Sequence, residues 1–469
     1  MLQNILILKQ ELLITLFIFL LLFLKVGTRE LSNQTMLVLM NSLLLLNFIA
    51  GFFYCDETTL FNGMYRSTQL LTFEKNILNL ATLLISMTSW NWLKGHKHLP
   101  EFYILLLSTL LGMFFMISSG NLLMFYLSLE LSTIPLAAMA NFDLQKRQSS
   151  EAAMKLIISS AFSSALLLFG ISMMYGTTGT LDFSSIPAHL NGSALQVFAF
   201  ILLLAGFAFK ISVVPFHLWT ADVYEGAPIA VTAYLSVVSK GAVMFVFLTA
   251  LYTVFKPLAD TWYAMICILA VMTIIIGNLF AIRQSNLKRF LAFSSIAQVG
   301  FMLIGISGSS TAGSASVIYF VLIYVFSNLA AFGVIAVVSH QTGKEKVHDY
   351  KGFYKNNKLL SWILAIALFS LAGVPPTAGF FGKFFLLMAG AEKGNYWLLT
   401  IAALNMIISF YYYLRIVKAI FMDENAQPIE KISIPILSKT GLIFCVIGIS
   451  IAGLWSNLYE YIYYLCLGF

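Results

Sequence analysis

The sequence predicts an all-α polytopic membrane protein with about 14 transmembrane helices. The chain of 469 residues is 60% hydrophobic and 10% charged, with a mean hydropathy of +0.88, whereas soluble domains carry roughly 25% charged residues. Apolar runs of about 20 residues recur along the whole length, and each could cross a hydrocarbon layer of about 30 Å as a helix. These runs do not alternate apolar with polar residues, as the strands of a membrane barrel would.

The expected helices lie between polar residues or Gly and Pro breaks. Their approximate ranges are 5–25, 36–53, 70–90, 102–118, 121–140, 152–175, 195–220, 228–254, 260–282, 288–306, 315–339, 359–390, 396–421 and 438–463. The first run continues into Lys25 without a small-residue cleavage site, so we expect a retained helix rather than a removable signal peptide.

Basic residues are unevenly distributed between alternate loops. Most of the 27 Lys and Arg residues lie in odd-numbered loops or at the helix ends beside them. The even-numbered loops and the helix ends beside them hold only Arg66, Lys75, Lys256 and Lys393. Because cytoplasmic loops carry the excess of Lys and Arg, both termini are expected on the outer, periplasmic side of the membrane.

The composition also limits partners and cofactors. The net charge of +7 comes from basic residues beside apolar helices, so we expect contact with the lipid bilayer and no nucleic acid. The four cysteines are far apart, and no clustered His completes a metal site. No Walker loop, GxGxxG motif or nucleophile elbow is present. We therefore expect no cofactor, metal or redox centre in this chain.

Two expected helices carry breakers in their middle. In the seventh, Lys210 is followed by Pro215, and in the twelfth, Pro375 and Pro376 precede Lys383. A proline removes a backbone donor and clashes with the preceding turn, so both helices should be interrupted at mid-membrane. Such backbone survives there only beside protein or a watery cavity.

Interrupted helices five spans apart predict two repeated, inverted halves, formed by spans 4–8 and 9–13 with broken helices 7 and 12. The chain then divides into an N-terminal three-helix region (1–101), a first repeat (102–255), a second repeat (256–421) and a C-terminal helix (422–469).

Few charges lie deep inside the expected helices. They are Glu130, Lys210, Lys240 and Lys383. A charge in hydrocarbon costs about 3 kcal/mol on insertion scales, so such groups usually line an ion or proton path. Glu130 needs a partner, and we expect Lys210, because an ion pair lowers the cost of burying both charges. Disturbing that pair would let the lysine release a proton. Four groups on four helices therefore predict a proton relay.

The buried charges could also have purely structural roles. Glu130 and Lys210 could only tie two helices together, and Lys240 and Lys383 could snorkel, although each lies far from its helix end. His217 could pass protons between Lys210 and Lys240, or equally be a hydrogen-bonded structural residue.

Small polar residues and broken backbone could contribute to the path. Ser294, Ser295 and Gln298 in the tenth span could order water or could pack helices. Lys383 follows a double-proline break, where free carbonyls and water could solvate its charge.

Two stretches around the breaks resemble a known family. The stretch 205–228, which contains Lys210, Pro215 and His217, is similar to a segment shared by antiporter-like subunits of respiratory complex I and Mrp-type cation/proton antiporters. With the stretch 371–383, the chain is most similar to the subunit N family of NADH-quinone oxidoreductases. Related M subunits typically have a glutamate at the position of Lys383, and L subunits are longer.

The resemblance implies roles for the buried charges. Glu130 and Lys210 would couple the subunit to its neighbours, Lys240 would be the central relay, and Lys383 would be the terminal proton donor or acceptor. NADH, FMN, iron–sulfur clusters and quinone would be held by partner membrane and peripheral subunits of complex I, in a bacterial inner membrane.

The expected function is proton translocation driven by redox chemistry in those partners. An Mrp-type antiporter that exchanges Na⁺ for H⁺ and a membrane scaffold without transport activity remain alternatives.

Overall fold

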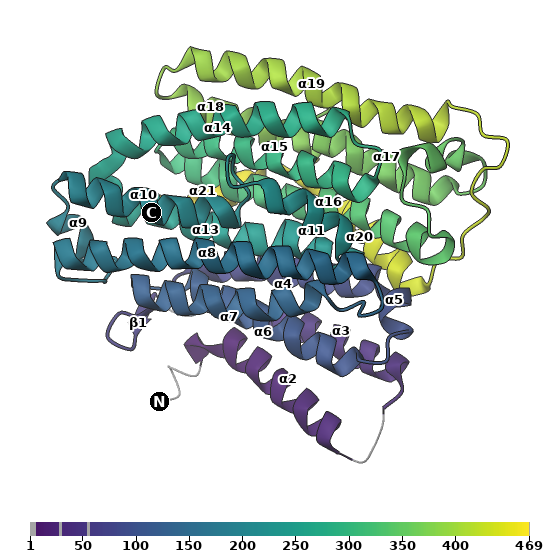
Figure 1. Ribbon diagram of the computed structural model, residues 1–469, viewed down its shortest axis with the longest axis horizontal. Helices are drawn as coiled ribbons and strands as arrows, with labels where there is room; N and C mark the ends of the chain where they lie inside the picture. The colour runs from purple at the N-terminus through teal and green to yellow at the C-terminus, as the bar shows by residue number, and fades with distance from the viewer. Residues whose placement is uncertain (1–5, 28–30, 54–56, 469) are drawn as a thin grey trace.

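The computed structural model describes residues 6–27, 31–53 and 57–468. In this part of the chain the protein is a bundle of packed helices with one short β-hairpin, and Figure 1 shows α2 and α19 on opposite sides of the bundle. Eleven of the described helices are long and apolar enough to cross a membrane, and three shorter apolar helices form parts of broken spans. The all-α, multi-pass prediction is confirmed, whereas the count of about 14 spans stays a prediction.

The N-terminal region packs three long helices against the rest. Its elements are α2 (Lys9–Val26), α3 (Asn33–Ala50), β1 (Thr58–Leu60), β2 (Tyr65–Ser67), α4 (Gln69–Thr88) and α5 (Trp90–Lys94). The first residue of the expected first span, residue 5, lies outside the described residues. The side chain of Thr68 accepts a hydrogen bond from the Leu71 amide at 3.2 Å and so fixes the start of α4.

The middle of the chain contains the first broken helix and two π-helical segments. Its elements are α6 (Leu99–Ile117), α7 (Leu122–Ala140), α8 (Arg147–Thr178), α9 (Ile186–His189), α10 (Ala194–Lys210), α11 (Leu218–Gly226), α12 (Ile229–Tyr234), η1 (Leu235–Ser239), α13 (Lys240–Thr249), η2 (Ala250–Val254) and η3 (Lys256–Leu258).

The second half contains the other broken helix. Its elements are α14 (Ala259–Ile282), α15 (Leu287–Ser307), α16 (Thr311–Thr342), η4 (Val347–Tyr350), η5 (Phe353–Lys355), α17 (Lys358–Ala372), α18 (Ala378–Ala391), α19 (Tyr396–Phe421), α20 (Ile436–Leu454), α21 (Asn457–Leu465) and η6 (Cys466–Gly468). The C-terminal region, expected as one helix, therefore contains two, because the chain leaves helical geometry at Trp455.

Both predicted helix breaks are confirmed, and side chains satisfy their backbone groups. In the first break, Thr273 Oγ1 accepts from the Val214 amide at 3.1 Å. The Trp219 indole donates to the Phe209 carbonyl at 3.1 Å. In the second break, Gly373 ends α17 with a φ of +90°, a conformation that favours glycine. Two half-helices therefore end inside the bundle with their carbonyl ends facing protein.

The buried and exposed helices follow the pattern of a membrane bundle. α15 and α16 are buried along almost their whole length, whereas α3, α8, α19 and α20 expose many large apolar side chains. An apolar surface of this extent fits a lipid environment.

Candidate functional site

Lys210 is the last residue of α10 and is held by hydroxyl groups. Its Nζ donates to Thr133 Oγ1 on α7 at 2.8 Å and to Ser160 Oγ on α8 at 2.7 Å. The carboxylate of Glu130, one turn before Thr133, accepts from the Ser164 hydroxyl, one turn after Ser160. The expected direct ion pair between Lys210 and Glu130 is therefore wrong in this structure. Thr133, one turn after Glu130 on the same face of α7, lies against the lysine in its place.

Glu130 and Lys210 are both half-buried at the surface of the chain. A charge near the middle of a membrane is costly when it faces lipid. This edge of α7, α8 and α10 is therefore a place where another protein surface would stabilise the charges.

Lys240 begins α13 directly after the π-helical segment η1, and π-helical turns are frequent at functional sites. Its side chain is 4% exposed. Nζ donates to Ser295 Oγ on α15 at 2.7 Å and lies 5.2 Å from the centre of the Tyr224 ring on α11. A hydroxyl oxygen and an aromatic face therefore solvate the ammonium group.

Lys383 is fully buried and reaches the broken end of α17. Its Nζ donates to the carbonyl of Leu371 at 2.8 Å and to that of Ala372 at 3.0 Å, and it lies 5.0 Å from the centre of the Phe301 ring. Carbonyls at a helix C-terminus lack intrahelical partners and carry partial negative charge. The double-proline break thus supplies the solvation that the sequence predicted for this lysine.

Polar side chains of α15 link the surroundings of the last two lysines. The carbonyl of Leu371, which contacts Lys383, also accepts from Gln298 Nε2 at 2.9 Å. The Gln298 amide donates to the Tyr413 hydroxyl at 3.1 Å, which is hydrogen-bonded to Ser294. The next residue on α15 is the serine that contacts Lys240. Hydrogen-bonded groups therefore run from Lys383 to the turn of α15 beside Lys240.

His217 precedes α11 and is 8% exposed. Its Nδ1 has no hydrogen-bond partner among the described residues. The structure brings neither Lys210 nor Lys240 into hydrogen-bond contact with it, so its part in proton transfer stays a prediction.

The sequence prediction missed the burial of Lys75. Lys75, counted with the even-numbered loop at the start of the expected helix 70–90, lies inside α4 and is 3% exposed. Its Nζ pairs with Glu11 Oε1 on α2 at 2.5 Å and donates to the Tyr65 hydroxyl at 2.9 Å. Burial raises the pKa of the Tyr65 phenol, which therefore stays a neutral donor to Glu11. Neighbouring Glu74 is fully buried, and neither carboxyl oxygen has a hydrogen-bond partner among the described residues.

Lys75→Met is expected to lower the free energy of unfolding by roughly 3–5 kcal/mol, because the Glu11 carboxylate would stay buried without its cation. Thermal unfolding of the purified protein measures this loss. Adding Glu11→Gln should recover part of the stability, whereas Lys94→Met, at an exposed position, should change it little. An unfolding temperature unaffected by Lys75→Met would contradict a stabilising role for the pair.

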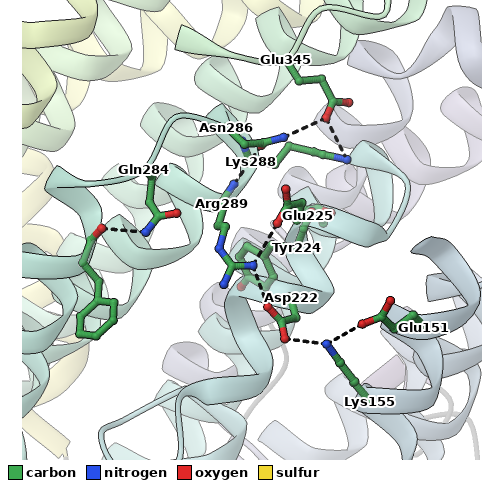
Figure 2. A network of polar contacts seen from close by, with 12 residues as sticks. Glu151, Lys155, Asp222, Tyr224, Glu225, Gln284, Asn286, Lys288, Arg289 and Glu345 are labelled. Carbon is green, nitrogen blue, oxygen red and sulfur yellow. Dashed lines mark hydrogen bonds and ion pairs between the residues drawn. The ribbon is translucent and has the colours of Figure 1, made fainter. Parts of the chain in front are cut away.

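A network of charged side chains joins α8, α11 and the start of α15 (Figure 2). It consists of the pairs Lys155–Asp222, Lys155–Glu151, Arg289–Asp222, Arg289–Glu225 and Lys288–Glu345. A cavity of about 410 Å³ adjoins it, with Glu225, Lys288 and Glu345 in its wall. Polar groups around a cavity of this size could hold several waters.

No cluster of three or more His, Cys, Asp or Glu side chains in the described part of the chain could hold a metal ion. The described cysteines Cys267, Cys445 and Cys466 are free thiols.

Comparison with known proteins places the chain in a family. Residues 119–409 match the family described as NADH:quinone oxidoreductase/Mrp antiporter, TM. The chain is 50% identical over 410 residues to NADH-quinone oxidoreductase subunit N of Phocaeicola vulgatus, covering 86% of this chain and 87% of that protein. The chain belongs to the subunit N family. It is also 36% identical to the subunit N of Desulfitobacterium hafniense, over 87% of this chain and 86% of that one.

Solved structures show how widely the subunit N fold is shared. A chain of respiratory complex I from Thermus thermophilus superimposes with a TM-score of 0.82 at 27% identity, covering 96% of this chain and 98% of that one. A chain of the Mrp complex from Dietzia sp. DQ12-45-1b superimposes with a TM-score of 0.88 at 18% identity, covering 99% of this chain and 97% of that one. The second match shows the fold alone.

Membership in the subunit N family confirms the resemblance found around the two helix breaks. Glu130, Lys210, Lys240 and Lys383 all lie inside the matched segment 119–409, whereas the Lys75 pair lies outside it.

Proposed function

We propose that the chain is a proton-translocating membrane subunit of an NADH:quinone oxidoreductase, with Glu130, Lys210, Lys240 and Lys383 as its relay. One observation carries the proposal: Lys240 and Lys383 are buried, and among the described residues their ammonium groups hydrogen-bond to neutral oxygens and lie beside aromatic rings. No ion pair among the described residues involves either of them. Each can lose its proton without leaving an unpaired buried carboxylate, whereas the Glu11 carboxylate holds Lys75 in its charged form.

Glu130 and Lys210 supply the coupling to neighbouring subunits. Both lie at the surface of the chain, so a charge on a neighbour can act on them. Thr133 and Ser160 stabilise the Lys210 ammonium when the Glu130 charge is offset by that neighbour. A change in the neighbour's charge then alters how readily Lys210 gives its proton to the next group.

The energy for transport comes from partner subunits. Moving one charge against 100 mV costs about 2.3 kcal/mol, so each transfer must be biased by coupling to redox chemistry elsewhere. NADH, FMN, iron–sulfur clusters and quinone are assigned to peripheral and membrane partners. The subunit lies in a bacterial inner membrane with both termini periplasmic, and His217 can add a proton-carrying group beside the first break.

Two alternatives make different predictions about partners. The fold similarity to an Mrp complex chain, with a TM-score of 0.88, favours considering an Mrp-type antiporter. A membrane scaffold without transport activity would need the apolar surface to lie in the lipid, but it would not need the buried lysines. Purifying the complex through a tag on this chain distinguishes the proposed function from that of an Mrp-type antiporter. We expect to recover a complex that contains iron–sulfur subunits and has NADH:quinone activity. Recovery of small membrane subunits alone would overturn the proposal.

A further inference from the structure

Asp222 on α11 bridges two other helices in the network of charged side chains. Its Oδ2 accepts from Lys155 Nζ on α8 at 2.7 Å, and its Oδ1 accepts from Arg289 Nη1 on α15 at 2.7 Å. Figure 2 shows the carboxylate of Asp222 between the two cations. Each carboxylate oxygen therefore binds a different helix.

Both bridged helices lead directly to a lysine of the proposed relay. Ser160, which accepts from Lys210, lies five residues after Lys155 on α8. Ser295, which accepts from Lys240, lies six residues after Arg289 on α15. At 1.5 Å per residue these separations are only about 8–9 Å along continuous helices.

The bridging residue also lies beside a group that contacts Lys240. Tyr224, two residues after Asp222, is fully buried and places its ring 5.2 Å from Lys240 Nζ. Helix α11 spans only Leu218–Gly226 and follows the first break. Its position therefore depends on side-chain contacts with its neighbours and not on continuity with α10.

We infer that Asp222 is a positioning residue that couples the Lys210 site to the Lys240 site, an inference that rests on the proposed function. A shift of α8 caused by a change at Glu130 and Lys210 is transmitted through Asp222 to α11 and α15. The Tyr224 ring and the Ser295 hydroxyl around Lys240 move with those helices.

The two ends of the bridge are not equivalent. Arg289 keeps a second acceptor on α11, Glu225 Oε2 at 3.0 Å, when Asp222 is neutralised. The other partner of Lys155 is Glu151 at 2.7 Å, on α8 itself. Asp222→Asn therefore removes the ion pair between α8 and α11 while α11 stays paired with α15.

Asp222→Asn is expected to lower proton pumping per assembled complex about fivefold to tenfold, which is the lower end of the range typical of coupling between sites. Assembly should be normal, because the side chains of Asp222, Lys155 and Arg289 are 34%, 42% and 32% exposed and exposed ion pairs add little stability. Asp222→Glu should restore most of the pumping. The matched control Glu151→Gln removes an equal charge from the same lysine within one helix, and it should pump normally.

A double-mutant cycle separates coupling from a general structural effect. Lys155→Gln combined with Asp222→Asn should pump no more slowly than Asp222→Asn alone, since both changes break the same link. A native pumping rate in Asp222→Asn would overturn the inference. So would an equal loss of pumping in Asp222→Asn and in Glu151→Gln. Retained pumping in Lys240 and Lys383 variants would instead reject the proposed function.

Discussion

Lys383→Arg is expected to lower quinone-linked proton pumping at least tenfold in complexes that assemble normally. The guanidinium can donate to the same carbonyls of Leu371 and Ala372 that hold the lysine. It stays protonated, however, because the pKa of arginine lies above about 12. The change therefore keeps the charge and removes only proton release. Fluorescence quenching of a pH dye in inside-out vesicles, divided by the amount of assembled complex, measures the effect.

Lys75→Arg is the matched control for this experiment. Lys75 is as deeply buried, but its charge is paired with Glu11. A permanent positive charge there should support near-native pumping. Lys383→Met, with a side chain of similar length, should lose pumping as Lys383→Arg does. Native pumping by both Lys383 variants would show that Lys383 is not part of the relay. If Lys75→Arg lost as much pumping as Lys383→Arg, the loss would be due to the size of the arginine side chain.

Glu130→Gln is expected to lower pumping about tenfold, which corresponds to about 1.4 kcal/mol of lost coupling. The amide keeps the shape of the side chain and an oxygen that accepts from Ser164, so only the charge is lost. Lys210 would then keep its hydroxyl partners but no longer respond to a change in that charge. Vesicle pumping assays with equal complex content measure the loss.

Ser164→Ala provides the comparison for Glu130→Gln, because it removes the hydrogen bond and leaves the charge. We expect at most a twofold effect. If Ser164→Ala were as slow as Glu130→Gln, the orientation of the carboxylate and not its charge would control Lys210. Unchanged pumping by Glu130→Gln would contradict the coupling role of the acid.

The architecture was predictable wherever local chemistry decides it. Apolar run length locates a membrane helix, and a proline cannot donate to the helical ladder, so Pro215 and the Pro375–Pro376 pair located both breaks. The setting of Lys383 followed for the same reason, since a broken helix must leave carbonyls free nearby.

Contacts that depend on how the helices pack were not predictable. Thr133 and Ser160 are ordinary small residues in the sequence, and only the packed helices show that they, and not Glu130, accept the hydrogen bonds of Lys210. Ser294 and Ser295 are adjacent, yet one contacts Tyr413 and the other Lys240.

Lys75 was misplaced because it lies near the start of an apolar run. Sequence position alone cannot tell a residue buried in protein from one at the membrane surface. Its partner Glu11 is 64 residues away in the chain. The sequence did contain one signal for this pair, because Glu11 and Lys75 lie in two apolar runs of the same N-terminal region.

The most direct test is the initial rate of NADH-driven proton pumping by complexes carrying Lys240→Arg, compared with native complexes at equal content in the same vesicles. Lys240 lies between the other two relay lysines in the sequence and contacts Ser295, on the helix that leads toward the Lys383 site. A permanently protonated side chain there should lower the rate at least tenfold while the complex keeps its subunits. A native pumping rate would contradict proton transfer through the buried lysines.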